Sequence, residues 1–393
     1  MKKLLSLLMI ALMLAMPFTA FADGDGAVPL TGEVVYVYNW NMYIADGSEG
    51  SINVNEEFTR RTGIQVVYDI YDTNEILYTK LKTGGANYDV IIPSDYMIGK
   101  LIEEDMLAEI NYDNIPNYQY IDEQFKNQNY DPANKYSVPY TWGSVGIIYN
   151  TKYVTKPVTS WSILWDEEYA GKILQFDNSR DAFAIAELLL GFEQGLNTTD
   201  PDELAAAADK LAEQKPLVQE YIMDQVFSKM EHEEAWIAPY YAGDYLTMLE
   251  NNEDLAFCFP EEGYNLFIDA MCIPKNAQNK EAAEKYINFI CSPEIMSQNL
   301  EFLGYSAPSS AAKELMDPET TSNEVAYPSA ETLSRGQAFN NLPTETVQTM
   351  NDLFNNVKAS ESGWSLYIMI AVIAVVVVIG VAAYLRKKKR NDY

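Results

Sequence analysis

Hydrophobic and polar positions between residues 34 and 106 follow two periodicities. Short runs of β-branched and aromatic residues are typical of strands, and longer segments with apolar residues three or four positions apart are typical of helices. Glycines at Gly63 and at Gly84-Gly85 follow two of the helical segments, where glycine often ends a helix. The predicted strands are residues 34–38, 64–70 and 88–93, and the predicted helices are residues 52–62, 74–83 and 98–106. This order predicts a mostly parallel sheet with helices on both faces.

The same alternation resumes after Tyr140. It predicts strands over residues 145–150, 172–176, 234–241 and 255–260, and helices over residues 182–190, 201–213 and 280–291. Two α/β lobes fit a chain of 393 residues better than one. We therefore expect an α/β fold with two lobes, each a mostly parallel sheet flanked by helices.

One aspartate interrupts an apolar stretch, LFIDAMCIP, which runs from Leu266 to Pro274. The stretch is short, contains aromatic and β-branched residues and stops at a proline, so it predicts a buried strand or the end of one. A buried carboxylate without a partner is unfavourable, so it usually meets a counter-charge or becomes protonated. The cation that meets Asp269 comes either from the protein or from outside it.

Both ends of the chain carry signals that lie outside the globular fold. Residues 1–22 combine two lysines, an apolar stretch and a small-residue cleavage site, which is typical of a secretory signal peptide. Ser365 to Leu385 is uncharged and would form a helix of roughly 30 Å, enough to cross a membrane. The basic tail, residues 386–393, is typical of a cytoplasmic flank. We expect a single-pass protein of the cell membrane with extracytoplasmic lobes and a cytoplasmic C-terminus.

The charge of the outer part is strongly negative. Between Asp23 and Trp364 there are 20 lysines and arginines against 56 aspartates and glutamates, a net charge of −36. This excludes nucleic acid as a partner and suits a cation, although solubility alone also explains it. The three cysteines do not make a disulfide framework. Cys258, Cys272 and Cys291 lie in apolar contexts typical of buried thiols, and a Cys258–Cys272 bridge stays open.

Aromatic and acidic residues follow several of the predicted strands. In open α/β sheets, ligands bind outside the carboxyl ends of the strands. Carboxylates bind ammonium groups, and aromatic faces contact methylene groups and cations. The stretches concerned are Asn39 to Tyr43, Pro93 to Tyr96, Asp177 to Asp181 and Pro239 to Asp244. Together with Asp269 they predict a pocket with aromatic walls and acidic ends, suited to an elongated cation.

The residues alone leave other functions open. A glycosidase could use two of the many carboxylates, but the one histidine, His232, lies in a polar stretch typical of an exposed helix. No GxSxG motif, phosphate loop or metal-ligand spacing is present. LPTET, Leu342 to Thr346, resembles a sortase signal, yet it also predicts the start of a helix that runs to about Lys358. Tyr240-Tyr241 is the one hint of an iron- or thiamine-binding protein. We predict no catalytic residue, metal site or cofactor.

Several longer stretches resemble one family, the bacterial spermidine/putrescine-binding proteins that capture substrate for polyamine ABC transporters. They include VYNWNMYI, EEFTRRTGIQVVYDIYDTNEILYTKLKTGGANYDVIIPSDYMI, YSVPYTWGSVGIIYN, SWSILWDEEYAGKI, CIPKNAQNKEAAEKYINFICSPE, GYSAPS and YPSAET. The resemblance implies a two-lobed periplasmic-binding-protein-like fold of type II, with crossing strands and a cleft that closes on the ligand. Its implied lobes are residues 28–142 with 268–312, and residues 143–267 with 313–360.

The resemblance also implies a polyamine as the ligand, and an ABC permease with its ATPase as partners. Asn178 stands where spermidine binders carry an aspartate, and Asp244 keeps an acid of the putrescine-selective relatives, although Tyr241 replaces their tryptophan. Putrescine and spermidine both stay open, with a slight preference for putrescine. A C-terminal glutamine contact has no clear match, and Gln337 and Phe339 are its candidates. The implied ligand-binding residues are Trp40, Asn41, Tyr43, Ser94, Tyr96, Asn178, Asp181, Tyr241, Asp244, Phe267, Asp269 and Tyr305.

Overall fold

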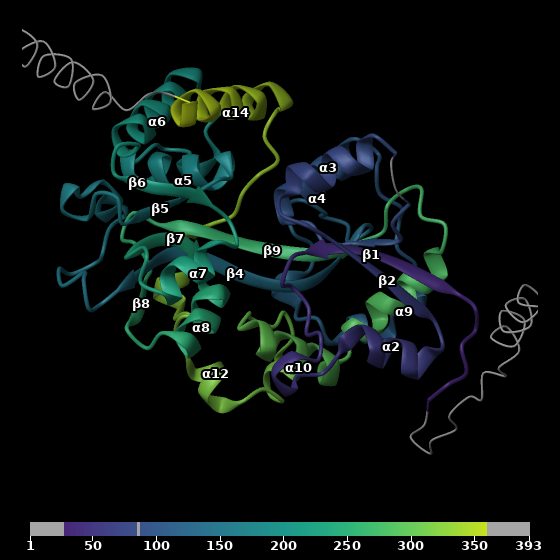
Figure 1. Cartoon of the computed structure of the whole chain (residues 1–393). Coiled ribbons are helices and arrows are strands. Elements are labelled where there is room, and N and C mark those ends of the chain that lie inside the picture. Colours follow the sequence, from purple (N-terminus) through teal and green to yellow (C-terminus); the bar gives the residue numbers. More distant parts are fainter. Residues whose placement is uncertain (1–26, 85–86, 360–393) are drawn as a thin grey trace, which may run out of the picture.

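A computed structural model describes residues 27–84 and 87–359 of the chain (Figure 1). Its strands are β1 Val34–Trp40, β2 Gln65–Tyr71, β3 Val90–Ile91, β4 Ser137–Asn150, β5 Ile173–Phe176, β6 Val218–Ile222, β7 Ile237–Tyr241, β8 Leu255–Cys258, β9 Tyr264–Cys272 and β10 Gly336–Gln337. Its α-helices are α2 Val54–Thr62, α3 Asn74–Lys82, α4 Asp95–Glu103, α5 Ser179–Leu190, α6 Pro201–Gln214, α7 Val226–Glu231, α8 Ala242–Asn251, α9 Lys280–Ile290, α10 Pro293–Leu303, α11 Ser310–Lys313, α12 Pro318–Ser322, α13 Ala330–Leu333 and α14 Thr344–Ala359.

The strands form one sheet that continues through both lobes, in the order β2-β1-β3-β9-β4-β7-β5-β6, with β10 beside β9 and β8 beside β4. The outer strands of each lobe are parallel, as expected from the strand–helix alternation. The centre is antiparallel, because β4 runs against β9, β7 and β8, and β9 runs against β3; the short β10 alone is parallel to β9 in the described sheet. The prediction of mostly parallel sheets therefore holds for the outer strands and is wrong for the centre.

Two long strands, β4 and β9, join the lobes across the middle of the molecule (Figure 1). The sequence predicts a strand only from Val145, whereas β4 already begins at Ser137 and pairs with β9 from there. Almost every residue of β4 is buried, so the strand lacks the alternation that would have revealed its first half. Gly143 is required in it, since a Cβ atom there would lie 2.6 Å from the ring of Phe267.

Helices cover both faces of the sheet in each lobe (Figure 1). In the lobe built on β5, β6 and β7, helices α5, α6 and α14 cover one face and α7 and α8 the other. In the lobe built on β1, β2 and β3, helices α3 and α4 lie on one side and α2, α9 and α10 on the other. The exact limits predicted for the two lobes stay predictions.

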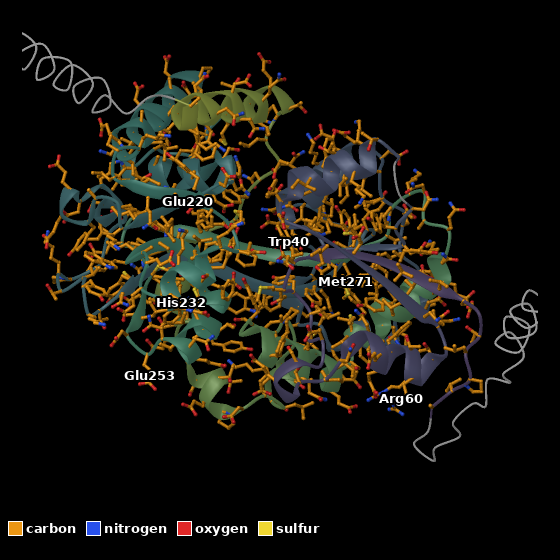
Figure 2. The ribbon with its side chains drawn as sticks, in the orientation of Figure 1. Trp40, Arg60, Glu220, His232, Glu253 and Met271 are labelled. Atoms are coloured by element: carbon orange, nitrogen blue, oxygen red, sulfur yellow. The ribbon has the colours of Figure 1, made fainter. Side chains whose placement is uncertain are left out.

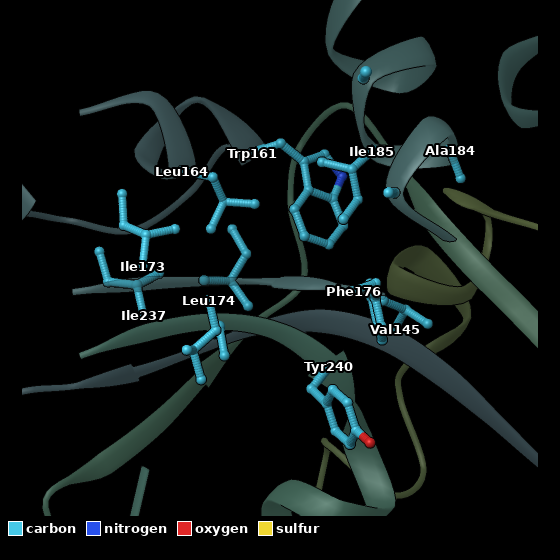
Figure 3. Packing of buried hydrophobic residues seen from close by; sticks show 14 of the residues in the cluster. Val145, Trp161, Leu164, Ile173, Leu174, Phe176, Ala184, Ile185, Ile237 and Tyr240 are labelled. Atoms are coloured by element: carbon cyan, nitrogen blue, oxygen red, sulfur yellow. The ribbon is translucent and has the colours of Figure 1, made fainter. Parts of the chain in front are cut away.

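Each lobe has its own hydrophobic core. We call the lobe built on β1, β2 and β3 the first lobe and the lobe built on β5, β6 and β7 the second lobe. In the second lobe Trp161 is 1% exposed and packs beside Leu164 and Ile185, over the strand residues Leu174 and Phe176 (Figure 3). Its indole nitrogen donates a hydrogen bond of 2.9 Å to the carbonyl oxygen of Gly263. Burial of such large side chains stabilises each lobe.

Several local predictions are corrected. Helix α4 begins at Asp95 and not at residue 98, because Ser94 has the extended backbone of an N-cap residue. The three cysteines are free thiols, as expected, and the Cys258–Cys272 bridge that the sequence left open is not formed. Cys272 and Cys291 are buried, whereas Cys258 is only partly buried, contrary to the expectation. Residues 342–346 lead into helix α14, as the helix prediction expected, and Met350 and Phe354 of this helix are buried.

In the part of the chain that the structure describes, no helix is long and apolar enough to span a membrane. The predicted signal peptide at residues 1–22, the predicted span from Ser365 to Leu385 and the basic tail lie outside the described residues.

Candidate functional site

A cavity lies between the lobes, beside β4 and β9, and its empty volume is about 770 Å³ when the adjoining space open to solvent is included. Its walls come from both lobes, and all twelve ligand-binding residues implied by the resemblance line it. Phe339 also lines it, whereas Gln337 does not and instead pairs with β9 through strand β10. Of the two C-terminal candidates, the structure therefore places only Phe339 at the cavity.

The strand ends bring these residues together. Trp40 ends β1 and Asn41 to Tyr43 follow it, Ser94 to Tyr96 follow β3, and Asn178 to Asp181 follow β5. Tyr241 ends β7, and Ala242 to Asp244 come directly after it. Because β1 and β3 are parallel, as are β5 and β7, the carboxyl ends of each pair meet at one edge of their lobe. The two edges face the same cavity.

Asp269 differs from the others because it lies inside a strand, β9, near the crossing between the lobes. Its side chain is 3% exposed, and its Oδ2 accepts a hydrogen bond of 2.7 Å from the hydroxyl of Tyr43. Its Oδ1 has no hydrogen-bond partner among the described residues. Burial raises the pKa of Asp269 to about 6, although the hydrogen bond from Tyr43 opposes that rise. Within residues 27–84 and 87–359, no lysine, arginine or histidine forms an ion pair with Asp269.

Two carboxylates of the second lobe accept hydrogen bonds from tyrosines. Asp244 Oδ1 accepts a hydrogen bond of 3.0 Å from the Tyr305 hydroxyl, and Asp181 Oδ2 accepts a longer one of 3.4 Å from Tyr241. Burial raises the pKa of each carboxyl to about 7. Burial likewise raises the pKa of Asp95 to about 8, and the negative charge of Asp269 adds to that rise.

The cavity lining contains six carboxylates and, within the described part of the chain, no lysine, arginine or histidine. The six are Asp72, Asp95, Asp181, Asp224, Asp244 and Asp269. No ion pair among the described residues includes any of them. A concave site with many carboxylates and no counter-charge strongly attracts a cation.

One guanidinium, that of Arg180, lies behind the lining. Its Nη2 donates hydrogen bonds to Asn197 Oδ1 at 2.8 Å and to the Asn340 carbonyl oxygen at 3.2 Å. Its carbon centre lies 4.5 Å from the centroid of the Phe339 ring. The charge of Arg180 lowers the pKa of Asp181, but less than burial raises it. The arginine therefore reduces the negative field of the cleft without filling the cavity.

Aromatic rings form the side walls. The rings of Tyr241 and Phe267 meet edge to face at 5.6 Å, and those of Phe267 and Tyr305 lie 6.3 Å apart. The Trp40 indole nitrogen donates a hydrogen bond of 2.9 Å to the Ile92 carbonyl oxygen, which fixes the ring at the end of β1. Figure 2 shows Trp40 between the two lobes. Such walls contact methylene groups and provide cation–π interactions.

Asn178 lines the cavity and is also the N-cap residue of helix α5. Its side-chain oxygen accepts a hydrogen bond of 2.8 Å from the backbone nitrogen of Arg180 and so caps helix α5. An aspartate could cap the helix equally well. The neutral side chain at this position therefore is not a requirement of the fold.

Sequence reasoning missed three of the lining carboxylates as site residues, Asp72, Asp95 and Asp224. Asp224 follows β6, an edge strand whose polar residues did not resemble a strand. Asp72 lies just after β2 and directly before Thr73, the N-cap residue of helix α3. The signal available for Asp224 was its place after the short stretch VQEYI, which alternates imperfectly.

The features suggestive of an enzyme do not come together. His232 lies exposed at the end of α7, and Figure 2 places it on the outside of the second lobe, away from Trp40. Among the described residues no three histidine, cysteine or acidic side chains are arranged to hold a metal ion.

Known proteins share both sequence and fold with this chain. The chain matches the family of bacterial extracellular solute-binding proteins over residues 86–335. It is 36% identical to the spermidine/putrescine-binding periplasmic protein of Salmonella typhimurium, over 79% of this chain and 87% of that protein. It is 30% identical to the putrescine-binding periplasmic protein SpuD of Pseudomonas aeruginosa, over 84% of this chain and 93% of that protein.

Solved structures agree with the sequence comparisons. The spermidine/putrescine ABC transporter substrate-binding protein PotD of Streptococcus pneumoniae superimposes with a TM-score of 0.71 at 37% identity, covering 83% of this chain and 98% of that one. The Tp0655 (TpPotD) lipoprotein of Treponema pallidum gives a TM-score of 0.74 at 28% identity, over 84% and 100%. The two-lobed α/β fold implied by the resemblance is thereby confirmed. This chain belongs to the bacterial extracellular solute-binding proteins, in the branch related to the spermidine/putrescine-binding proteins.

Proposed function

We propose that this chain is the extracytoplasmic substrate-binding subunit of a polyamine ABC importer, which captures putrescine or spermidine between its lobes and delivers it to the permease. The observation that carries the proposal is the cavity lining, with six carboxylates, aromatic walls and no basic residue within the described part of the chain. The names of the relatives support the same ligand class. The chain is a carrier and not an enzyme, as solute-binding proteins are.

The geometry suits an elongated cation better than a compact one. Carboxylates stand apart along the cavity, on β9, at the start of α5 and in the first turn of α8. Each can accept charge-assisted hydrogen bonds from an ammonium group, which are roughly twice as strong as neutral ones. The rings of Trp40, Tyr241 and Phe267 can contact the methylene groups between the charges. An inorganic cation would leave these apolar walls unused.

A calorimetric titration tests the proposal directly. The outer part of the chain is expected to bind one molecule of putrescine or spermidine per protein, while lysine and sodium compete weakly. The same protein incubated with glycosides is expected to give no turnover. Absence of binding by either polyamine would contradict the proposal.

For the location of the protein we propose a single-pass anchor, from Ser365 to Leu385, that holds the lobes on the outer face of the membrane. Its support is the apolar sequence and the basic tail. Helix α14 ends at Ala359 and packs against α5 and α6, so a chain that ends there keeps the second lobe complete.

A protein shortened to end at Ala359 is therefore expected to leave the membrane fraction and still bind polyamine. The measurement compares the distribution of full-length and shortened protein between membrane and soluble fractions, followed by titration of the soluble form. If the shortened protein stays with the membrane, the anchor lies elsewhere, for example in an uncleaved leader.

A further inference from the structure

Asp224 extends the cavity beyond the residues that the family resemblance implied. It lies in the turn between β6 and α7 of the second lobe and lines the same cavity as Asp269. Its Oδ2 accepts a hydrogen bond of 2.7 Å from Asn41 Nδ2 of the first lobe. Its Oδ1 accepts a long hydrogen bond of 3.4 Å from the hydroxyl of Tyr240. Both partners are neutral, so the charge of Asp224 is not compensated by either.

A second carboxylate faces Asp224 from the other lobe. Asp72, just after β2, lines the same cavity, and its negative charge raises the pKa of Asp224. Burial is the larger cause of that rise, and the hydrogen bond from Asn41 opposes it. Two carboxylates on opposite lobes repel each other as the cleft closes, unless a positive charge comes between them.

The walls around Asp224 are apolar. Met223 and Phe227 flank it from the second lobe, and Trp40 lines the same cavity from the first. A hydrocarbon segment that leaves the central aromatic walls can therefore continue toward Asp224 without losing apolar contact. This arrangement suits a chain of methylene groups that ends in an ammonium.

A second observation favours a hydrogen-bond donor from outside the protein. Asp269 is 3% exposed and lines the cavity, and its Oδ1 has no hydrogen-bond partner among the described residues. A buried carboxylate oxygen without a donor is unfavourable, so a ligand N–H group is the natural partner. Asp224 therefore offers a second negative charge to the ligand, in addition to Asp269.

We propose that Asp224 is a specificity-determining residue, which receives the third ammonium of a triamine and so favours spermidine over putrescine. The inference rests on the proposed polyamine-binding function. A diamine has two charges, which Asp269 and the pair of Asp181 and Asp244 can accept. The third charge of a triamine needs another acceptor, and the neutral Asn178 cannot supply one. A carboxylate has about four acceptor positions, so Asp224 can bind the ammonium while it keeps its hydrogen bond from Asn41.

The experiment is a titration of the wild type and of Asp224→Asn with putrescine and with spermidine. The variant keeps the shape and the carbonyl oxygen that accepts from Asn41, but it removes the charge. We expect spermidine affinity to fall at least ~10-fold, or about 1.4 kcal/mol, and putrescine affinity to change less than ~3-fold. Asp209→Asn is the matched control, because Asp209 is exposed on α6 and its loss changes the net charge equally. This control is expected to leave both affinities unchanged.

Two monoacetylated spermidines make the test sharper. Acetylation of one end removes one ammonium from the ligand, so the isomer that has lost the charge facing Asp224 should bind the wild type more weakly. For Asp224→Asn, the affinities of this isomer and of spermidine should differ much less. The acetylation and the substitution remove the same contact, so their effects do not add. Should the variant unfold, the two acetylated ligands on the wild type still decide the matter: if both bind as tightly as spermidine, the proposal is wrong.

The outcomes separate this inference from the proposed function. If the wild type binds neither polyamine, the proposed function fails and the inference falls with it. If the wild type binds both and Asp224→Asn weakens both equally, Asp224 is a contact between the lobes and not a determinant of ligand length. If Asp224→Asn changes neither affinity, no ammonium lies beside it.

Discussion

Replacement of Asp269 by asparagine is expected to weaken polyamine binding at least ~10-fold and to leave the empty protein as stable as before, or more stable. Hydrogen bonds to a charged group contribute about 1.5–3 kcal/mol net, and more is lost when the ligand ammonium is left without its counter-charge. The Tyr43 hydroxyl, 2.7 Å from Oδ2, can still donate to the amide oxygen of the variant. The substitution should therefore weaken ligand binding without destabilising the fold.

The stability part of this expectation follows from the pKa of Asp269. Burial raises it to about 6 in the folded protein. An unfolded aspartate has a pKa of about 3.9, so the difference corresponds to about 3 kcal/mol against the ionised carboxylate at neutral pH. Asparagine removes this term, although its amide hydrogens need partners at about 1–3 kcal/mol if they find none. The two effects offset each other, so the empty variant should not melt much below the wild type.

A second buried aspartate provides the control. Asp131 is also 3% exposed, but it accepts hydrogen bonds from the backbone nitrogens of Lys135, Tyr136 and Ser137 and from the Ser137 hydroxyl. Asp131→Asn should therefore lower the melting temperature and keep the affinity. Titration and thermal melting of both variants decide the matter. If Asp269→Asn also melts much lower and keeps its affinity, Asp269 is a structural residue.

The contrast between these two aspartates shows what the sequence could and could not predict. The apolar stretch around Asp269 predicted a buried strand, and the structure has one from Tyr264 to Cys272. Whether a protein cation would meet the carboxylate depended on residues far away in the chain. Tyr43 is separated from Asp269 by 226 positions. No periodicity in the sequence encodes that contact.

The strand ends were predictable because each follows from a local apolar run, and parallel strands then bring their carboxyl ends together. Asp224 was not predictable in this way, since the strand before it, β6, is an edge strand with polar residues. The same holds for the first half of β4, which is buried on both faces and therefore has no alternating pattern. The placement of Asn41 against Asp224, which joins the two lobes, depends on how the lobes close.

The empty protein is expected to be more stable at pH 5.5 than at pH 8. Burial raises the pKa of several cavity carboxyls, to about 8 for Asp95, about 7 for Asp181 and Asp244 and about 6 for Asp269. Between pH 4 and 8 the folded protein therefore binds more protons than the unfolded chain, so the free energy of unfolding falls as pH rises. The contribution of a single carboxyl with a folded pKa near 7, such as Asp181, to the free energy of unfolding would fall by about 2 kcal/mol as the pH rises from 5.5. The groups share one cavity and influence one another, so their contributions do not add in full.

Saturating polyamine should reduce the pH dependence of stability. The ammonium groups stabilise the ionised carboxylates, so the carboxyls release their protons when the ligand binds. Affinity itself should accordingly weaken as pH falls from 8 toward 5.5. Glu187 also has a pKa raised to about 7 by burial, but it does not line the cavity, so its share should persist with ligand bound. Thermal melting at several pH values, with and without putrescine, measures both effects. Asp244→Asn should diminish the fall in melting temperature of the empty protein between pH 5.5 and 8. An empty protein that instead gains stability as pH rises over this range would show that its cavity carboxylates are already compensated by charges within the protein.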